Sequence, residues 1–328
     1  MDFFNLFQRS LKTNNKTLSP SICLKTIGGD MERGLEEEYY KFLPEAFEVA
    51  GNSIQEYITK MGYEHPLFSW IQTRLQDPSF QHMCFRYGTH VYSILIALVG
   101  LDSNDDNFAI IRKQDYDNLI FESEKNNLLP CIIPININNW STILDGIHMF
   151  HATNIEPISL EECSDEKLVP MSRWEINNMA IDIVVQYLCD KGYNVFSLCD
   201  VVGIEPQVWF YDKQGRRCFV YVNPITGNFP ESVKYRLNIN SIKRFTDKYK
   251  ECVGYYAKMN IFPADPIAYD IKGEMVPLSK RENLNNPVEI LFRGHGFYVN
   301  FTGILELHQA INEDDSIQTI DVDYYNVR

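Results

Sequence analysis

Three acidic residues in the second half of the chain, Asp200, Glu205 and Asp212, are candidates for holding one metal ion. They stand before and after a short apolar stretch, residues 207–211 (QVWFY), which has the composition of a β-strand. Carboxylate oxygens are the ligands that Mg²⁺ prefers, and a bound Mg²⁺ can activate water for phosphodiester hydrolysis. These three residues are therefore the catalytic set that we predict if the protein is a metal-dependent nuclease.

A second group of residues has the chemistry of nucleic-acid binding. Residues 212–258 contain ten Lys and Arg against four Asp and Glu, although the whole chain has a net charge of −14. Such basic residues can follow a phosphate backbone, and aromatic residues between them can stack on bases. The alternative is an amphipathic helix with its rings in the core and its lysines in water. The candidate binding residues of this segment are Lys243, Arg244, Lys248 and Lys250.

Trp209 and His295 complete the candidate binding residues. Trp209 lies in the apolar stretch 207–211, where it is either a ligand platform or a strand residue of the core. His295 stands between Gly294 and Gly296, which can present backbone N–H groups and an imidazole to a ligand or form a tight connection. Because no HExxH, P-loop or CxxC pattern occurs, no cofactor is predicted, and Mg²⁺ enters only with the nuclease alternative.

The order of elements expected across residues 172–258, helix, strand, strand, hairpin, strand and helix, resembles the common core of the PD-(D/E)xK nuclease superfamily. In that family an acidic residue precedes or begins the second strand, and a carboxylate, one spacer and a lysine lie on the third. Asp200 or Glu205 stands where the first acid is expected, but residues 220–223 (VYVN) place Tyr221 and Asn223 at the carboxylate and lysine positions. Neither residue supplies the required charge. The resemblance therefore implies a non-catalytic relative that keeps a binding face; the alternative is an unrelated α/β core.

The elements expected along the chain define an α/β (α+β) protein. Periodic apolar residues predict helices over 33–62, with a kink or a restart at Pro44, and over 66–78, 80–100, 115–126, 172–191, 239–257 and 304–311. Strands are expected at 194–199, 289–293 and 297–301, in a hairpin of 207–211 with 218–222, and at 128–137. The last of these contains two prolines, which predict an edge position.

The length of 328 residues predicts two domains. We expect an N-terminal segment and linker over 1–30, an acidic, helix-rich α+β domain over 31–165, and an α/β domain over 166–328 with a small mixed sheet flanked by helices. Residues 1–165 carry 12 basic and 23 acidic residues, whereas residues 166–328 carry 18 and 21. The acidic half favours a protein partner, and residues 212–258 favour an acidic macromolecule such as nucleic acid.

Cysteine usage and hydropathy predict the compartment. The eight cysteines are scattered, mostly in apolar stretches, which is typical of free thiols in a reducing environment. The longest apolar run, residues 91–101, is shorter than the roughly 20 residues that a spanning helix needs. The sequence thus predicts a cytoplasmic, non-catalytic binding or interaction protein.

Overall fold

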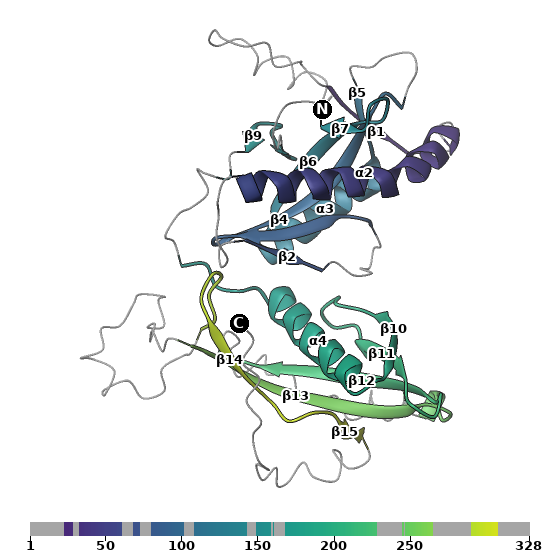
Figure 1. Ribbon diagram of the computed structural model, residues 1–328, viewed down its shortest axis with the longest axis vertical. Helices are drawn as coiled ribbons and strands as arrows, with labels where there is room; N and C mark the ends of the chain where they lie inside the picture. Colours follow the sequence, from purple (N-terminus) through teal and green to yellow (C-terminus); the bar gives the residue numbers. More distant parts are fainter. Residues whose placement is uncertain are drawn as a thin grey trace, which may run out of the picture. The chain divides into compact units, whose positions relative to one another are not determined.

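The structure is a computed structural model that describes residues 23–28, 33–60, 68–72, 80–101, 108–142, 149–158, 160, 168–227, 245, 247–264 and 290–307. The chain divides into two compact units: unit 1 comprises residues 1–73 and 78–166, and unit 2 comprises residues 74–77 and 167–328. Each unit contains a sheet of mixed strand directions and at least one helix (Figure 1), which confirms the α+β class.

Unit 1 is built on a nine-stranded sheet with the order β1-β5-β4-β6-β8-β9, in which β3 joins β4, β2 joins β3 and β7 joins β6. Two pairs of strands are parallel, β1 with β5 and β4 with β6. The strands are β1 (Cys23–Ile27), β2 (Phe68–Ile71), β3 (Met83–Tyr87), β4 (His90–Val99), β5 (Phe108–Arg112), β6 (Leu129–Asn136), β7 (Ser141–Thr142), β8 (Met149–His151) and β9 (Pro157–Ile158), and the helices are α2 (Arg33–Lys60) and α3 (Lys113–Asn126).

The long apolar run in unit 1 is strand β4, so the helix predicted over 80–100 is wrong. Alternate residues of β4 face opposite helices. Ile94 and Ile96 share a core with Tyr39 of α2, whereas Leu95 and Ala97 share a core with Leu119 of α3. A strand covered on both faces needs apolar side chains at every position, which removes the period-two alternation that identifies strands. The helix predicted over 66–78 is also corrected, because residues 68–71 form β2. Unit 1 is therefore less helical than expected.

Strand β6 confirms the strand expected over 128–137 but not its edge position. It pairs with β4 on one side and with β7 and β8 on the other. The Pro130 carbonyl accepts from the N–H of Ala152, so the nitrogen of Pro130 faces the side of β7 and β8. On that side the paired residues are 131, 132, 135 and 136, which skip both prolines. An inner strand tolerates proline, which has no backbone N–H, because its short neighbours on that side do not pair with residues 130 and 134.

Helix α2 begins at Arg33, as predicted, and continues through Pro44 to Lys60, so the chain does not start a new helix at the proline. Its residues Tyr39, Leu43, Ala46, Ala50 and Ile54 are buried against the sheet. Helix α3 confirms the helix predicted over 115–126.

Unit 2 is built on a six-stranded sheet with the order β10-β11-β12-β13-β14, and β15 also pairs with β13. Strands β12 and β13 are parallel, and the other pairs are antiparallel. Helix α4 packs on one face of this sheet (Figure 1), against Val208, Val220 and Met259. The elements are α4 (Arg173–Asp190), β10 (Asn194–Leu198), β11 (Val208–Tyr211), β12 (Arg217–Ile225), β13 (Val253–Pro263), β14 (Phe297–Phe301) and β15 (Leu305–Glu306).

Local sequence signals define the ends of α4. The Ser172 side chain accepts from the N–H of Glu175, and the Glu175 carboxylate accepts from the N–H of Ser172, which forms a capping box. Gly192 has a φ of 78°, and the N–H groups of Gly192 and Tyr193 bond to the carbonyls of Cys189 and Leu188. This is the Schellman arrangement, which favours glycine at that position. The helix, β10 and the β11–β12 hairpin are all confirmed.

The end of the predicted helix 239–257 is wrong, because residues 253–257 lie in β13. A β-carbon on Gly254 would lie 2.4 Å from the Leu307 side chain and 2.7 Å from the Phe219 ring, so the strand is tightly covered at that point. Strand β14 is confirmed, but its expected partner at 289–293 is not a regular strand in its described residues, where Phe292 forms a single bridge to Pro170. The start of the helix predicted over 304–311 is wrong, because residues 305–306 form β15; Leu307 is helical, and residues 308–311 lie outside the described residues.

Candidate functional site

Asp200 is fully buried in unit 2, where it accepts hydrogen bonds from two residues of α4. Its Oδ2 accepts from the indole Nε1 of Trp174 at 3.1 Å, and its backbone carbonyl accepts from the amide of Asn177 at 3.1 Å. Both donors lie on the first turns of α4. Asp200 therefore fastens the segment after β10 to the helix.

Asp212 lies at the other end of β11, in the turn of the hairpin. Its Oδ1 accepts from the N–H groups of Gln214 and Arg216, both at 2.9 Å, and its Oδ2 accepts from Arg216 Nε at 2.7 Å. These bonds satisfy the turn backbone, which is the usual role of aspartate in such turns. Its lone pairs are thus engaged by the hairpin.

Glu205 is the one candidate carboxyl that is partly open to solvent. Burial raises its pKa to about 7, and the nearby Arg173 opposes this shift. Burial, and to a lesser degree Glu205, also raises the pKa of Tyr221 on β12, which places the phenol near the carboxyl. Next to them, the Gln207 side chain exchanges hydrogen bonds with the backbone of Val222 at 2.9 and 3.3 Å, which fixes the start of β11 against β12.

The structure does not bring these three carboxylates together. Glu205 precedes β11 and Asp212 follows it, whereas Mg²⁺ ligands must all lie about 2.0–2.1 Å from one ion. No set of three His, Cys, Asp or Glu residues within the described part of the chain is arranged to hold a metal ion. The predicted sharing of one Mg²⁺ by Asp200, Glu205 and Asp212 is therefore contradicted.

Most buried polar side chains of unit 2 gather where α4 begins and where the parallel strands β12 and β13 end; we call this the polar end. Arg293 and Glu175 form an ion pair here with contacts of 2.8–3.1 Å, and their side chains are 3% and 5% exposed. Asn223 donates to the Tyr256 hydroxyl at 2.6 Å. The other members are Asn177, Asn178, Asp200 and Gln207. Sequence reasoning missed Glu175 and Arg293, although the capping-box spacing identifies Glu175 as a structural residue.

Trp209 lies in a cluster of rings on the sheet face opposite α4. Its ring centroid is 5.4 Å from Phe219, 5.9 Å from Phe245 and 5.8 Å from Tyr249. Lys248 places its Nζ 5.3 Å from the Tyr249 ring centroid, and both Lys248 and Lys250 are exposed. Lys243 and Arg244 lie outside the described residues. The structure thus brings Trp209 and Lys248 to one region, with Trp209 half-buried.

His295 is exposed in the turn between Phe292 and β14. Gly294 has a φ of 78°, and the N–H of His295 donates to the carbonyl of Phe292 at 3.3 Å. This geometry is that of the tight connection which was the alternative to a ligand site.

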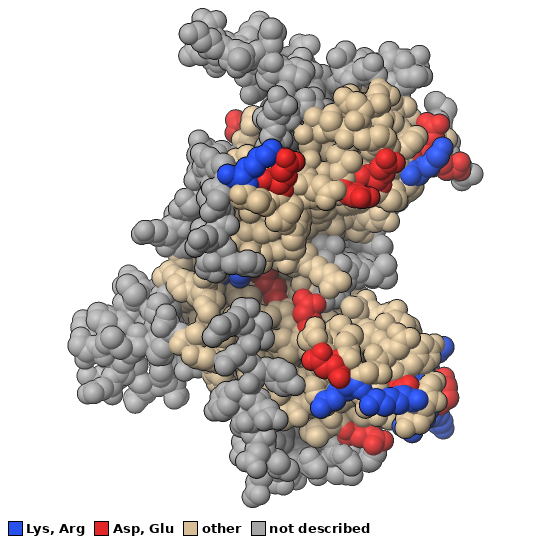
Figure 2. All heavy atoms as spheres, viewed as in Figure 1, with Lys and Arg blue, Asp and Glu red and all other residues tan. Residues whose placement is uncertain are grey.

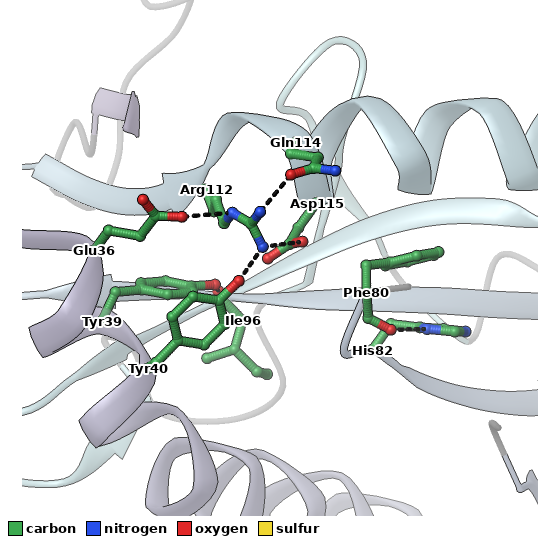
Figure 3. Close-up of polar contacts among 9 residues, drawn as sticks. All are labelled: Glu36, Tyr39, Tyr40, Phe80, His82, Ile96, Arg112, Gln114 and Asp115. Carbon is green, nitrogen blue, oxygen red and sulfur yellow. Dashed lines mark hydrogen bonds and ion pairs between the residues drawn. The ribbon is translucent and has the colours of Figure 1, made fainter. Parts of the chain in front are cut away.

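Unit 1 contains a polar cluster around Arg112, which sequence reasoning did not find (Figure 3). Arg112 bonds to Glu36 of α2 at 2.8 Å, to Asp115 of α3 at 3.4 Å, and also to Tyr40 and Gln114. Burial raises the pKa of Asp115 to about 6, the Arg112 charge opposes this, and Glu36 adds to it. The cluster joins the first turns of two helices at the ends of β1 and β5. Nothing in the spacing of these residues along the sequence distinguishes them.

Residues 174–307 match the model of a family described as a domain of unknown function, DUF8840. The match begins at the second residue of α4 and ends just after β15, so it spans the sheet of unit 2. No curated protein and no solved structure matches the chain. None of the described helices is long and apolar enough to cross a membrane.

Proposed function

We propose that the protein is a cytoplasmic, non-catalytic binding protein whose unit 2 recognises a partner. The observation that carries the proposal is the engagement of the acidic groups at the polar end: Arg293 neutralises Glu175, and Trp174 donates to Asp200. A catalytic carboxylate must be free to coordinate a metal ion or to exchange a proton. Acids that serve as structural anchors support binding rather than turnover.

The arrangement of elements in unit 2 is compatible with the resemblance to the PD-(D/E)xK core. A helix, three strands and a fourth strand parallel to the third occur in that order from α4 to β13. At the family's catalytic positions on the third strand, β12 carries Tyr221 and Asn223, and Asn223 is bonded to Tyr256. Under the proposal, unit 2 keeps the scaffold of such a core without its chemistry.

The test is a nuclease assay with the purified full-length chain. Labelled single- and double-stranded DNA and RNA are incubated with Mg²⁺ or Mn²⁺, and we expect no cleavage above the level of a Glu205→Ala variant. Glu205 is the informative position because it is the open candidate carboxyl. Asp190→Ala, at an exposed carboxylate on the last turn of α4, is the matched control. Metal-dependent turnover that survives in Asp190→Ala but is lost in Glu205→Ala would falsify the proposal.

A protein partner is the favoured class, and nucleic acid is the second candidate. The observation that favours nucleic acid is the cluster of Trp209, Phe245 and Tyr249 beside Lys248 and Lys250. Aromatic rings with interleaved cations are typical of single-strand binding sites.

Fluorescence anisotropy of a labelled oligonucleotide at several salt concentrations tests the second candidate. If nucleic acid binds, affinity falls steeply with salt, and each phosphate contact removed lowers the slope by about one. Lys248→Glu with Lys250→Glu, and charge reversal at Lys243 and Arg244, are the informative variants. Lys113→Glu, in an exposed ion pair of unit 1, is the control. Absence of salt-sensitive binding at low ionic strength excludes this candidate.

A further inference from the structure

Strand β10 forms an open edge of the sheet in unit 2 (Figure 1). It is the first strand in the sheet order, and within the described residues β11 is its one strand partner. Asn194, Phe196 and Ser197 are exposed along it. An edge strand presents unpaired backbone N–H and C=O groups, and proteins usually protect such edges with lysine or proline. The β10 sequence, NVFSL, contains neither residue.

Aromatic rings lie directly beside this edge. Phe196 is 44% exposed, and its ring centroid is 4.6 Å from Tyr211 and 6.5 Å from Trp209 on the neighbouring strand. The ladder between β10 and β11 is irregular between Val195 and Ser197, which leaves Phe196 outside the register. A β-bulge of this kind redirects the side chain of the extra residue. Among the described residues, the edge therefore combines a strand backbone that lacks a second strand partner with an exposed ring that a second chain can cover.

Positive charge surrounds the end of the edge where β10 begins. Lys213, in the hairpin turn, places its Nζ 5.9 Å from the Tyr193 ring centroid, immediately before β10. Arg217 is exposed and lies at the level of Asn194, because Tyr211 pairs with both residues. Lys191 adds a third exposed cation. Of the acids in this neighbourhood, Asp212 is engaged by Arg216, Asp190 accepts from the neutral amide of Gln186, and exposed Glu251 lies near Cys252 on the side of Arg217. Charges of both signs are visible on the surface of unit 2 (Figure 2).

We infer that the free edge of β10 binds an extended acidic peptide segment of a partner protein as an added antiparallel strand. The inference rests on the proposed function, because it names the chemistry of the partner. Backbone pairing supplies the affinity in this mode of recognition, and side chains at alternate positions supply the specificity. An apolar side chain of the peptide covers Phe196, and its acidic residues meet Lys191 and Lys213, while Arg217, on β12, adds to the positive potential from further inside the sheet. In the antiparallel direction, those acidic residues stand toward the carboxyl end of the peptide.

A synthetic peptide tests the inference with the full-length protein. The probe is a fluorescent peptide of about ten residues, long enough to cover a five-residue strand, in which valine alternates with aspartate. We expect saturable binding by the wild-type chain. Binding should weaken about tenfold in Phe196→Ala, which removes the exposed ring, and also in Lys213→Glu with Lys191→Glu. Phe121→Ala, at a ring of α3 in unit 1 that is 59% exposed, is the matched control and should bind as wild type.

Two further measurements separate strand addition from simple charge attraction. Amide hydrogen exchange of residues 193–199 should slow when the peptide saturates the protein, and a peptide with N-methylated amides on its pairing side should not bind. Unchanged exchange at 193–199, or equal affinity in Phe196→Ala and wild type, overturns the inference. Displacement of the peptide by an oligonucleotide that protects the same amides also overturns it, in favour of nucleic acid. Failure here leaves the outcome of the nuclease assay unaffected, so the two proposals fall separately.

Discussion

At the scale of single residues, burial decides what the polar side chains of this protein can do. Glu175 and Arg293 are separated by 118 positions and form a buried ion pair that ties the segment before β14 to the start of α4. Asp115, in unit 1, has a side chain only 3% exposed and shares Arg112 with Glu36. The charges of Glu175 and Arg293 neutralise each other, whereas in unit 1 the carboxyl groups of Glu36 and Asp115 share the single guanidinium of Arg112.

Removing one partner of the buried pair in unit 2 should be costly. Arg293→Met leaves the Glu175 carboxylate buried without its counter-charge, and we expect the free energy of unfolding to fall by about 3–5 kcal/mol. Urea denaturation measures this loss. The double variant Glu175→Gln with Arg293→Met removes the isolated charge and should recover part of the stability. Equal losses in the single and double variants would contradict a role for charge compensation.

The stability of unit 1 should depend on the protonation of Asp115. Its pKa is raised to about 6 in the folded chain, mainly by burial, against about 3.9 for an unperturbed aspartate. The folded state thus binds the proton more tightly, so this contribution is fully present below pH 4 and is lost as the pH rises through 6. Asp115→Asn should flatten this decline, which amounts to at most about 3 kcal/mol. Thermal unfolding of both proteins between pH 4 and 8 provides the measurement, and identical profiles would contradict it.

At the scale of elements, close packing selects conformations that local sequence does not reveal. Gly254 of β13 lies against the side chains of Leu307 and Phe219, which leave no room for a β-carbon at this position. The lysine- and tyrosine-rich segment that leads into it reads as a helix, yet residues 253–257 pair with β12 along their whole length. Pairing on both sides of β13 therefore prevails over the local pattern.

Substitution of Gly254 should destabilise unit 2. In Gly254→Ala the new methyl group meets Leu307 at 2.4 Å and Phe219 at 2.7 Å, and overpacking of this kind costs about 1–3 kcal/mol. Gly34→Ala in α2 is the matched control, because nothing lies within 4 Å of its β-carbon and alanine favours a helix. Denaturation midpoints should move in opposite directions. A neutral Gly254→Ala would mean that Leu307 yields to the methyl group without loss.

At the scale of the whole molecule, each unit has its own hydrophobic core. The core of unit 1 is centred on β4, between α2 and α3, and the core of unit 2 lies between α4 and its sheet. Compact units with separate cores are able to unfold separately. Hydrogen exchange resolved by segment can therefore distinguish them.

Core substitutions should act within one unit. Ile96→Ala in β4 removes a fully buried side chain and should cost about 2–5 kcal/mol, with faster amide exchange in β4, β6 and α2. Val220→Ala in β12, at an equally buried position, should accelerate exchange in β11, β13 and α4 instead. Loss of protection in both units from either substitution would contradict independent unfolding.

The sequence by itself determined the features that depend on neighbouring residues. These are the capping box at Ser172, the left-handed Gly192, the β11–β12 hairpin, and helices α3 and α4. The tertiary structure decided the features that depend on what covers a segment. Residues 94–99 of β4 are all apolar because helices cover both faces of the strand, and β6 accepts prolines because its neighbours are short. Strand β11 separates Asp212 from Asp200 and Glu205, which both precede it. Side chains distant in sequence, such as Glu175 and Arg293, meet only when the sheet and α4 pack together.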